Sequence, residues 1–359
     1  GHDISAGGLI TTLLEMCFSN MEGGMEISLN KIKEDDIIKI LFAENPGIVI
    51  QVKDKHKEEV KKILEDAGIG YVKLGKPTEE RHILVEKGDA TYQFGIDYLR
   101  DVWYSTSYLL DRKQSMNGCA KKRFENYKKQ PLEFVFDKSF TGKLSQFGLN
   151  PDRRTPTGIK AAIIREKGTN GEREMAYMLY LAGFDVKDVT MTDLVSGRET
   201  LEDINFIVFC GGFSNSDVLG SAKGWAGAFL FNPKAKAALD NFYARKDTLS
   251  LGVCNGCQLM IELNLINPDF TKKAKMLHND SHKFESKFVG VTVPMNRSVM
   301  FGSLSGSKLG IWVAHGEGKF SLPYHEDKYN VVLKYSYDEY PGNPNGSDYS
   351  CLLYTSDAA

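Results

Sequence analysis

The stretch SLGVCNGCQLM, residues 250–260, decides how the second half of the chain folds. An apolar run ends at Cys254, which has one glycine two residues before it and another two residues after it, and a helical pattern follows. Glycines at these positions let a strand turn sharply into a helix and hold the side chain between them at the end of the strand. The stretch therefore predicts a strand, a tight turn that carries Cys254, and a helix.

Predicted strands and helices alternate on the N-terminal side of this turn. Apolar strand patterns cover 159–166, 184–191, 206–214 and 248–254, and helical patterns cover 170–183, 232–245 and 255–263. This alternation with short loops is typical of a mostly parallel sheet covered by helices on both faces. Ligands of such sheets bind at the carboxyl ends of the strands, where Gly211, Gly212 and Cys254 fall.

The first hundred residues mix strands and helices less regularly. Helices are predicted at 7–19, 35–44, 55–68 and 96–114, and strands at 24–29, 48–52 and 71–77. We therefore expect an α/β chain of three parts. These are an N-terminal α+β domain at 1–114, a connector at 115–157 without a clear period, and a second α/β domain at 158–359.

Composition argues against some classes of function. The 359 residues carry a formal net charge of -2, so we expect no nucleic acid and no membrane among the partners. No apolar run reaches the roughly 18–20 residues that a membrane-spanning helix needs. Six scattered cysteines do not resemble a disulfide framework, which favours a cytoplasmic location. Both ends look cut, since the chain begins without Met and the stretch from Ser350 onward predicts no element that would complete a domain.

Cys254 and Cys257 form a C-x-x-C pair that has several interpretations. A zinc clip needs further ligands at zinc spacing, which the sequence does not offer, and a redox pair is expected after an early strand of its domain. The turn between two glycines instead favours a nucleophile, because the N-terminus of the following helix stabilises a thiolate. The backbone N–H after Cys254 and the Gly211–Gly212 turn would then face an oxyanion. A buried, purely structural cysteine is the alternative.

Asp3 and Ser5 precede Gly7 and Gly8 at the start of the chain. Residues of these types before a predicted helix are typical N-caps. They also suit a magnesium–nucleotide site, because a carboxylate binds Mg²⁺ and a helix N-terminus binds phosphate. The residues alone leave both interpretations open.

Several motifs also carry a family resemblance. The run Gly252-Val253-Cys254-Asn255-Gly256-Cys257-Gln258 resembles the nucleophile motif of class I glutamine amidotransferases. CGGFSNSDVLGSAKGWAG at 210–227, REKGTNGEREMA at 165–176 and HNDSHKFESKFV at 278–289 are similar to the glutaminase domain of the formylglycinamide ribonucleotide amidotransferase family. GHDISAGGL at 1–9, RDVWYSTSYLL at 100–110 and MNGCAKKR at 116–123 resemble the second synthetase half of the large, fused form of that enzyme.

The resemblance implies a flavodoxin-like glutaminase domain and an ATP-dependent ligase that forms C–N bonds in purine biosynthesis. The expected partners are glutamine, ATP with Mg²⁺, formylglycinamide ribonucleotide and the rest of a longer polypeptide. Cys254 would be the nucleophile, and four residues would form the oxyanion hole or bind glutamine: Gly211, Gly212, Asn255 and Gln258. Asp3 would bind the metal and Ser5 the nucleotide. A freestanding cysteine hydrolase and a catalytically dead binding module are the alternatives.

His315-Gly316-Glu317 is an H-x-E sequence that follows Cys254 in the chain. A thiol nucleophile needs a His base oriented by a carboxylate. In the family that the chain resembles, however, the catalytic His and Glu look like a later His-Pro-Glu sequence. The family also has a separate H-G-E-G segment, and His315 matches that segment. We therefore expect His315 to be a structural or site-wall residue, the catalytic pair to lie beyond Ala359, and the chain by itself to have negligible glutaminase turnover.

Overall fold

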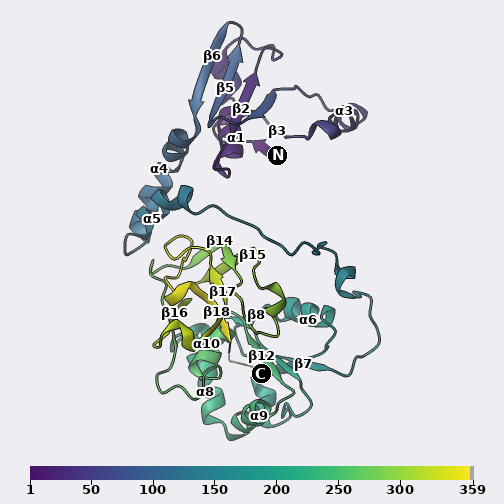
Figure 1. The fold of residues 1–359 in the computed structure, drawn as a ribbon, viewed down its shortest axis with the longest axis vertical. Coiled ribbons are helices and arrows are strands. Elements are labelled where there is room, and N and C mark those ends of the chain that lie inside the picture. The colour runs from purple at the N-terminus through teal and green to yellow at the C-terminus, as the bar shows by residue number, and fades with distance from the viewer. Residues whose placement is uncertain (356–359) are drawn as a thin grey trace. The chain divides into compact units, whose positions relative to one another are not determined.

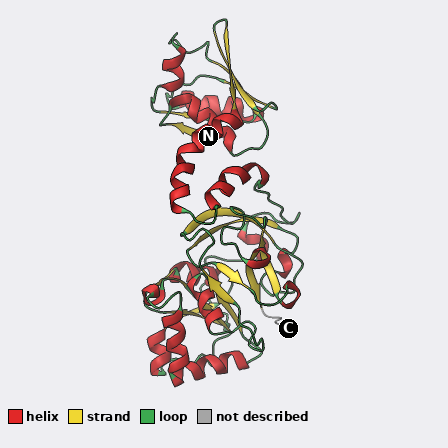
Figure 2. Cartoon of the chain, turned by 90° about the vertical axis from the view of Figure 1, so that its left-hand side faces the viewer, coloured by secondary structure: helices red, strands yellow, loops and turns green. Residues whose placement is uncertain are grey.

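The computed structural model describes residues 1–355, which divide into two compact units (Figures 1 and 2). The first unit comprises Gly1–Gln114 and Phe124–Pro131, and the second comprises Ser115–Arg123 and the chain from Leu132 onward. Helix α5, Cys119–Asn126, therefore contributes residues to both. Each unit has hydrophobic clusters of its own.

The first unit is built on a four-stranded sheet of order β4-β2-β5-β6, in which β2 and β5 are parallel and the outer pairs antiparallel. These strands are β2 Gly24–Ser28, β4 Gly75–Thr78, β5 His82–Lys87 and β6 Ala90–Gly95, and a separate ribbon pairs β1 His2–Ile4 with β3 Gly47–Val49. The helices are α1 Gly8–Phe18, α2 Ile37–Phe42, α3 Lys57–Asp66 and α4 Ile96–Gln114. Leu13 of α1 and Ile83 of β5 are fully buried in the core.

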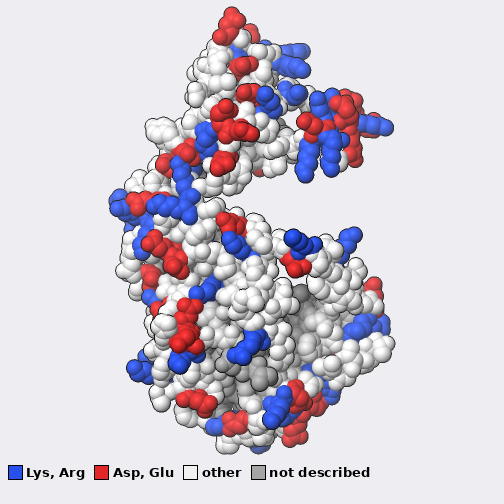
Figure 3. Space-filling view, in the orientation of Figure 1, with Lys and Arg blue, Asp and Glu red and all other residues white. Residues whose placement is uncertain are grey.

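The helices predicted for this unit are confirmed, and α4 has the predicted bounds. The strand predicted at 71–77 is wrong in its first part, because β4 begins only at Gly75. A side chain at Gly75 would lie 1.8 Å from the carbonyl oxygen of Glu26 on the neighbouring strand, so glycine permits this close pairing. The hairpin of β5 and β6 was not predicted. Figure 3 shows side chains of both charge signs crowded over α3.

The second unit contains a parallel sheet of order β12-β10-β7-β9. Its strands are β7 Lys160–Arg165, β9 Asp185–Thr190, β10 Phe206–Phe209 and β12 Leu249–Gly252. The helices around it are α6 Glu172–Leu181, α7 Met191–Ser196, α8 Lys223–Phe231, α9 Pro233–Ala244 and α10 Asn255–Glu262. The strand–helix alternation predicted from the sequence is confirmed here, and α7 and α8 are additional helices.

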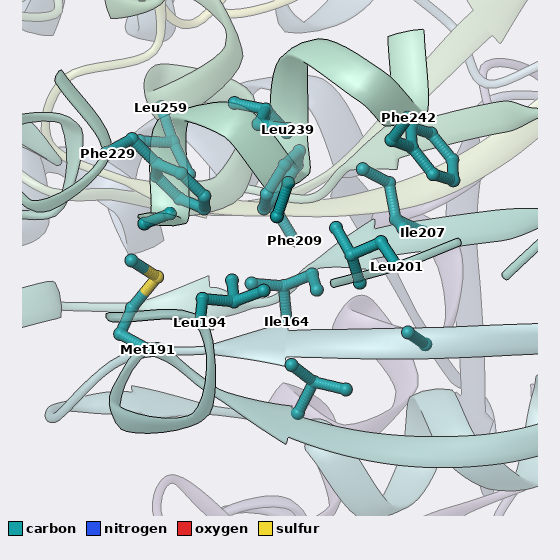
Figure 4. Close-up of a cluster of buried hydrophobic side chains, with 14 of the residues drawn as sticks. Ile164, Met191, Leu194, Leu201, Ile207, Phe209, Phe229, Leu239, Phe242 and Leu259 are labelled. Carbon is teal, nitrogen blue, oxygen red and sulfur yellow. The ribbon is translucent and has the colours of Figure 1, made fainter. Parts of the chain in front are cut away.

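The two faces of this sheet are covered by different helices. Alternate residues of β7 and β10, such as Ile164 and Phe209, join one cluster with side chains of α7, α8, α9 and α10 (Figure 4). The residues between them, such as Ile163 and Val208, join a second cluster with α6. Since strands covered on both faces are apolar throughout, β10 reads as the continuous run Phe-Ile-Val-Phe.

A second sheet, antiparallel and of order β15-β14-β17-β18, follows α10 in the chain. Its strands are β14 Glu285–Thr292, β15 Lys308–His315, β17 Asn330–Tyr335 and β18 Cys351–Thr355, and β13 Lys275–Leu277 pairs with β16 Lys319–Ser321 beside it. Short elements complete the fold: β8 Thr169–Asn170, β11 Gly211–Gly212, and the 3₁₀ turns at 54–56, 127–129, 144–147, 214–217, 302–304, 326–328 and 348–350. Ile261 of α10 packs in a cluster with Phe320 and Tyr354.

This second sheet was not predicted. The expectation that the stretch from Ser350 onward forms no element is wrong, because Cys351–Thr355 pairs with β17 and buries Cys351 completely. The last four residues of that stretch lie outside the described residues.

Candidate active site

Cys254 lies on a sharp turn between β12 and α10. It is the N-cap residue of α10, and its backbone has φ 52° and ψ -110°. A positive φ is uncommon for a residue with a side chain and costs of order 1–3 kcal/mol, so the surrounding structure must hold it. Its side chain is exposed, whereas burial raises the pKa of the Cys257 thiol to about 12. Of the two cysteines, Cys254 is the more exposed and therefore the more accessible to a reactant.

The two flanking glycines make the turn possible. A side chain at Gly252 would lie 2.6 Å from the carbonyl oxygen of Gly256, and one at Gly256 would lie 2.1 Å from the carbonyl oxygen of Phe209. Both obstacles are backbone atoms, which cannot rotate out of the way. Glycine at 252 lets α10 approach β12, and glycine at 256 lets it approach β10, as closely as they do.

The Gly211–Gly212 turn lies directly beside the thiol. A side chain at Gly211 would come within 3.2 Å of Cβ and 3.9 Å of Sγ of Cys254. Gly212 has φ 110°, and strand β11 that these two residues form pairs with Thr169 and Asn170 of β8. The structure thus brings together the nucleophile candidate and the glycine pair that the sequence predicts as its oxyanion partner.

Asn255 and Gln258 also lie at this turn, but their side-chain amides are buried. Asn255 Oδ1 accepts a hydrogen bond from the Ser214 backbone N–H at 3.1 Å, and Asn255 Nδ2 donates to Asp217 Oδ1 at 3.2 Å and to Gln258 Oε1 at 2.9 Å. Gln258 is 6% exposed and Asn255 is fully buried. The Asn255 amide therefore holds the loop after the Gly211–Gly212 turn against the start of α10, and Gln258 holds the Asn255 amide.

His315, the last residue of β15, sits in a closed environment. Its ring packs against the backbone of Gly318, where no side chain would fit, and Nε2 lies 3.4 Å from Asn345 Nδ2. Burial lowers the pKa of this imidazole, with the Glu285 carboxylate opposing the shift. A structural or site-wall role for His315 stays a prediction.

Two features near Gln258 were missed by sequence reasoning. Gln258 Nε2 donates to the carbonyl oxygen of Glu317 at 2.8 Å, and His278 Nδ1 lies 3.7 Å from Glu317 Oε1. These residues come from segments far from Cys254 in the chain and follow no short motif, so only the tertiary fold reveals that they meet.

Asp3 and Ser5 lie on or just after β1 and are exposed. Asp3 pairs with Ile48 of β3 in the ribbon, and its carboxylate lies 3.4 Å from His2 Nδ1. The N-cap of α1 is Gly7, with φ 85° and no side-chain cap, so the interpretation of Asp3 or Ser5 as a cap is wrong.

Whether Asp3 could bind a metal ion depends on the ligands around it. Among residues 1–355, no group of three or more His, Cys, Asp or Glu side chains is arranged to hold a metal ion. Mg²⁺ in nucleotide sites is commonly held by one or two carboxylates together with phosphate and water. Asp3, as a single exposed carboxylate, fits such a site only as one ligand among others.

Comparison with known proteins identifies both halves of the chain. Residues 158–357 match the family model of the CobB/CobQ-like glutamine amidotransferase domain, and residues 1–87 match the C-terminal domain of AIR synthase related proteins. A phosphoribosylformylglycinamidine synthase from Homo sapiens is 37% identical over 97% of this chain, and a probable chloroplastic/mitochondrial one from Arabidopsis thaliana is 36% identical over 97%. The chain belongs to the phosphoribosylformylglycinamidine synthase family.

The relatives are much longer than this chain. The chain covers 28% of the human relative and 26% of the Arabidopsis relative, about a quarter of their length. A solved structure entitled PurLQS from Thermotoga maritima matches 56% of this chain and 84% of that chain, at 27% identity and a TM-score of 0.45. In the described part of the chain, no helix is both long and apolar enough to cross a bilayer.

Proposed function

We propose that this chain is the part of a phosphoribosylformylglycinamidine synthase that carries the glutaminase nucleophile, Cys254, together with part of the ATP-dependent synthetase. The observation that carries the proposal is the exposed thiol on a strained turn, with Gly211 against it and a helix N-terminus behind it. Family membership of both halves supports it. The overall reaction would convert formylglycinamide ribonucleotide to the amidine, with glutamine as nitrogen donor.

The glutaminase step follows from the chemistry of the turn. The Cys254 thiolate attacks the carboxamide carbon of glutamine, and the carbonyl oxygen becomes an oxyanion. The backbone N–H of Asn255 and the Gly211–Gly212 turn would stabilise that charge. Collapse of the intermediate expels ammonia and leaves a thioester, which water hydrolyses to glutamate. Because the half-buried ring of His315 packs against Gly318 and lies beside Asn345, we assign the general base to a residue other than His315.

The synthetase step uses residues at the start of the chain. When bound, ATP with Mg²⁺ would activate the formyl amide oxygen of the substrate by phosphorylation, so that ammonia can displace phosphate. Asp3 would contribute one carboxylate oxygen to Mg²⁺, and Ser5 would hold an oxygen of the nucleotide. The positive φ of Gly7 brings the backbone around to the N-terminus of α1 beside these two residues. We place the enzyme in the cytoplasm.

Labelling with a diazoketone analogue of glutamine tests the glutaminase proposal. The analogue enters a glutamine site and alkylates the thiol there, so mass spectrometry of the digested chain should find it on Cys254. Cys257→Ser serves as the control, and it should label like the unmodified chain because Cys257 is half-buried and its pKa is raised to about 12. Modification of Cys257 instead, or equal labelling by a diazoketone without the glutamine moiety, would contradict the proposal.

A further inference from the structure

Asn279 holds the turn that follows β15. It is fully buried, and its side-chain Nδ2 donates to the carbonyl oxygens of His315 at 2.7 Å and Lys283 at 3.0 Å. Its Oδ1 accepts from the Gly318 backbone N–H at 3.1 Å, and its backbone N–H donates to the Gly316 carbonyl oxygen at 3.0 Å. Both amide hydrogens and the amide oxygen are used, so Asn279 fixes the backbone of residues 315–318 from three sides.

This turn is joined to the start of α10 through a single carbonyl group. Glu317 stands between the two glycines that Asn279 holds, and its carbonyl oxygen accepts the hydrogen bond from Gln258 Nε2. With its nitrogen committed to Glu317, Gln258 turns its oxygen toward Asn255 Nδ2. The Asn255 oxygen then faces the Ser214 N–H. Each amide therefore has one allowed orientation, because turning any of them over would set donor against donor.

The chain of amides ends on a loop that needs support. Asn215, Ser216 and Asp217 have φ of 52°, 57° and 49°, which are three consecutive left-handed residues with side chains. Such a conformation costs free energy at each residue and persists only where neighbours hold it. Asn255 holds both ends of this loop, through the Ser214 N–H and through Asp217. The loop directly follows the Gly211–Gly212 turn that faces Cys254.

We propose that Asn279 is a positioning residue for the glutaminase site. It acts through the turn at 315–318, Gln258 and Asn255, and it sets the place of the loop at 213–217 and thus of the oxyanion-binding turn before it. The inference rests on the proposed function, since it assigns a role within that site. Asn279 does not need to touch glutamine. Its loss would leave the thiol in place but misplace the groups that polarise the carbonyl.

The test replaces Asn279 in the full chain. Asn279→Asp keeps the shape and the acceptor but removes both Nδ2 donors. The rate at which the diazoketone analogue of glutamine labels Cys254 should fall about tenfold or more, because an error of about 1 Å in placement can cost 10²-fold. Alkylation of Cys254 by iodoacetamide, which needs no carbonyl polarisation, should stay within about twofold. Amide hydrogen exchange in a peptide containing Ser214 should become faster.

A matched control separates this role from general stability. Asn296 also makes side-chain bonds to backbone carbonyls and accepts one from Ser298, but only within residues 294–305. Asn296→Asp should change neither labelling nor exchange at Ser214. If Asn279→Asp does not fold, Asn279→Ala removes the same donors without adding charge and takes its place.

The outcomes distinguish the two proposals. Labelling and Ser214 exchange that both stay unchanged in the Asn279 variant would overturn the positioning role. If the analogue fails to label even the unmodified chain, the proposed function fails, and the exchange at Ser214 alone then decides whether Asn279 positions the loop. Equal losses with the analogue and with iodoacetamide would show a collapsed turn and would also overturn the proposal.

Discussion

Gly256 is the residue at which the turn around Cys254 tolerates a side chain least. The nearest obstacles to a Cβ there are the carbonyl oxygen and carbon of Phe209, at 2.1 and 2.6 Å. We predict that Gly256→Ala lowers the free energy of unfolding of the second unit by about 3 kcal/mol or more, the upper end for overpacking, because α10 must move away from β10. Urea unfolding followed by the fluorescence of the buried Trp225 measures this.

Gly302→Ala is the control for this prediction. The nearest atom to a side chain at Gly302 lies 3.6 Å away, which is an ordinary contact, so this variant should unfold within about 1 kcal/mol of the unmodified chain. Equal unfolding free energies for the two variants would show that the close approach at Gly256 is not what shapes the turn.

The sequence predicted the site residues that lie close to Cys254 along the chain, but not those that come from distant segments. Cys254, Gly252 and Gly256 lie within five positions, and glycine at fixed spacing around a nucleophile has a steric reason that can be read without a structure. Asn279 acts through backbone groups of a distant segment, and Glu317 acts through its own backbone carbonyl, which the Gln258 side chain reaches. No periodicity or spacing marks such contacts, because they depend on which loops the folded chain brings together.

At the scale of elements, helix α9 depends on its N-terminal cap. Asn232 Oδ1 accepts hydrogen bonds from the backbone N–H groups of Lys234 and Ala235, and Pro233 occupies the first turn. We predict that Asn232→Ala destabilises the second unit by about 1 kcal/mol and that Asn232→Asp, an equally good cap, has a far smaller effect. Thermal unfolding of both variants measures this, and equal losses would contradict the capping role.

Strand β14 carries a half-buried lysine, Lys287, that should make stability depend on pH. Lys287 Nζ lies 3.2 Å from Glu285 and 3.9 Å from the ring centre of Tyr340, and burial lowers the pKa of this lysine to about 8, with Arg123 adding to the shift and Glu285 opposing it. In the unfolded chain the pKa returns to about 10.4. Between these values the unfolded chain binds more protons, so the free energy of unfolding rises with pH.

The expected size of this effect is about 3 kcal/mol between pH 8 and 10.4, since each pKa unit corresponds to 1.36 kcal/mol. Lys287→Met should remove that rise, and Lys272→Met, at an exposed lysine, should keep it. Urea unfolding at pH 7.5, 8.5 and 9.5 compares the three proteins. If the free energy of unfolding changes with pH equally in Lys287→Met and in the unmodified chain, the lowered pKa of Lys287 is not the source of the pH dependence.

The elements themselves were predictable to different degrees. The strands of the parallel sheet and the helices α6, α9 and α10 could be read from the pattern, because apolar runs and helical periods mark them, whereas α7 and α8 were missed. The strands of the antiparallel sheet mix buried and exposed residues. In β14, Val289, Gly290 and Val291 are consecutively buried while Lys287 is half-buried, which breaks the alternation that would signal a strand.

At the scale of the whole molecule, the chain has two sets of cores. The cluster around Leu13, Ile83 and Ile96 consists only of residues from the first unit, and the clusters around both sheets of the second unit consist only of residues from the second. A proposed ligase that couples ammonia release to an ATP-dependent step needs two such bodies, because the two reactions require different sites. Their separate cores mean that each can be perturbed by itself.

Leu13→Ala tests this separation. Leu13 is fully buried, so truncation should cost the first unit about 2–5 kcal/mol. Where global opening limits exchange, that cost accelerates amide hydrogen exchange in β5 by about 30-fold or more. Exchange in β10 should not change. Leu194→Ala, at a fully buried position in the core of the parallel sheet, should give the reverse pattern. Faster exchange in both strands from either variant would mean that the two units unfold together, and separate responses would mean that the glutaminase half keeps its fold when the synthetase half loses stability.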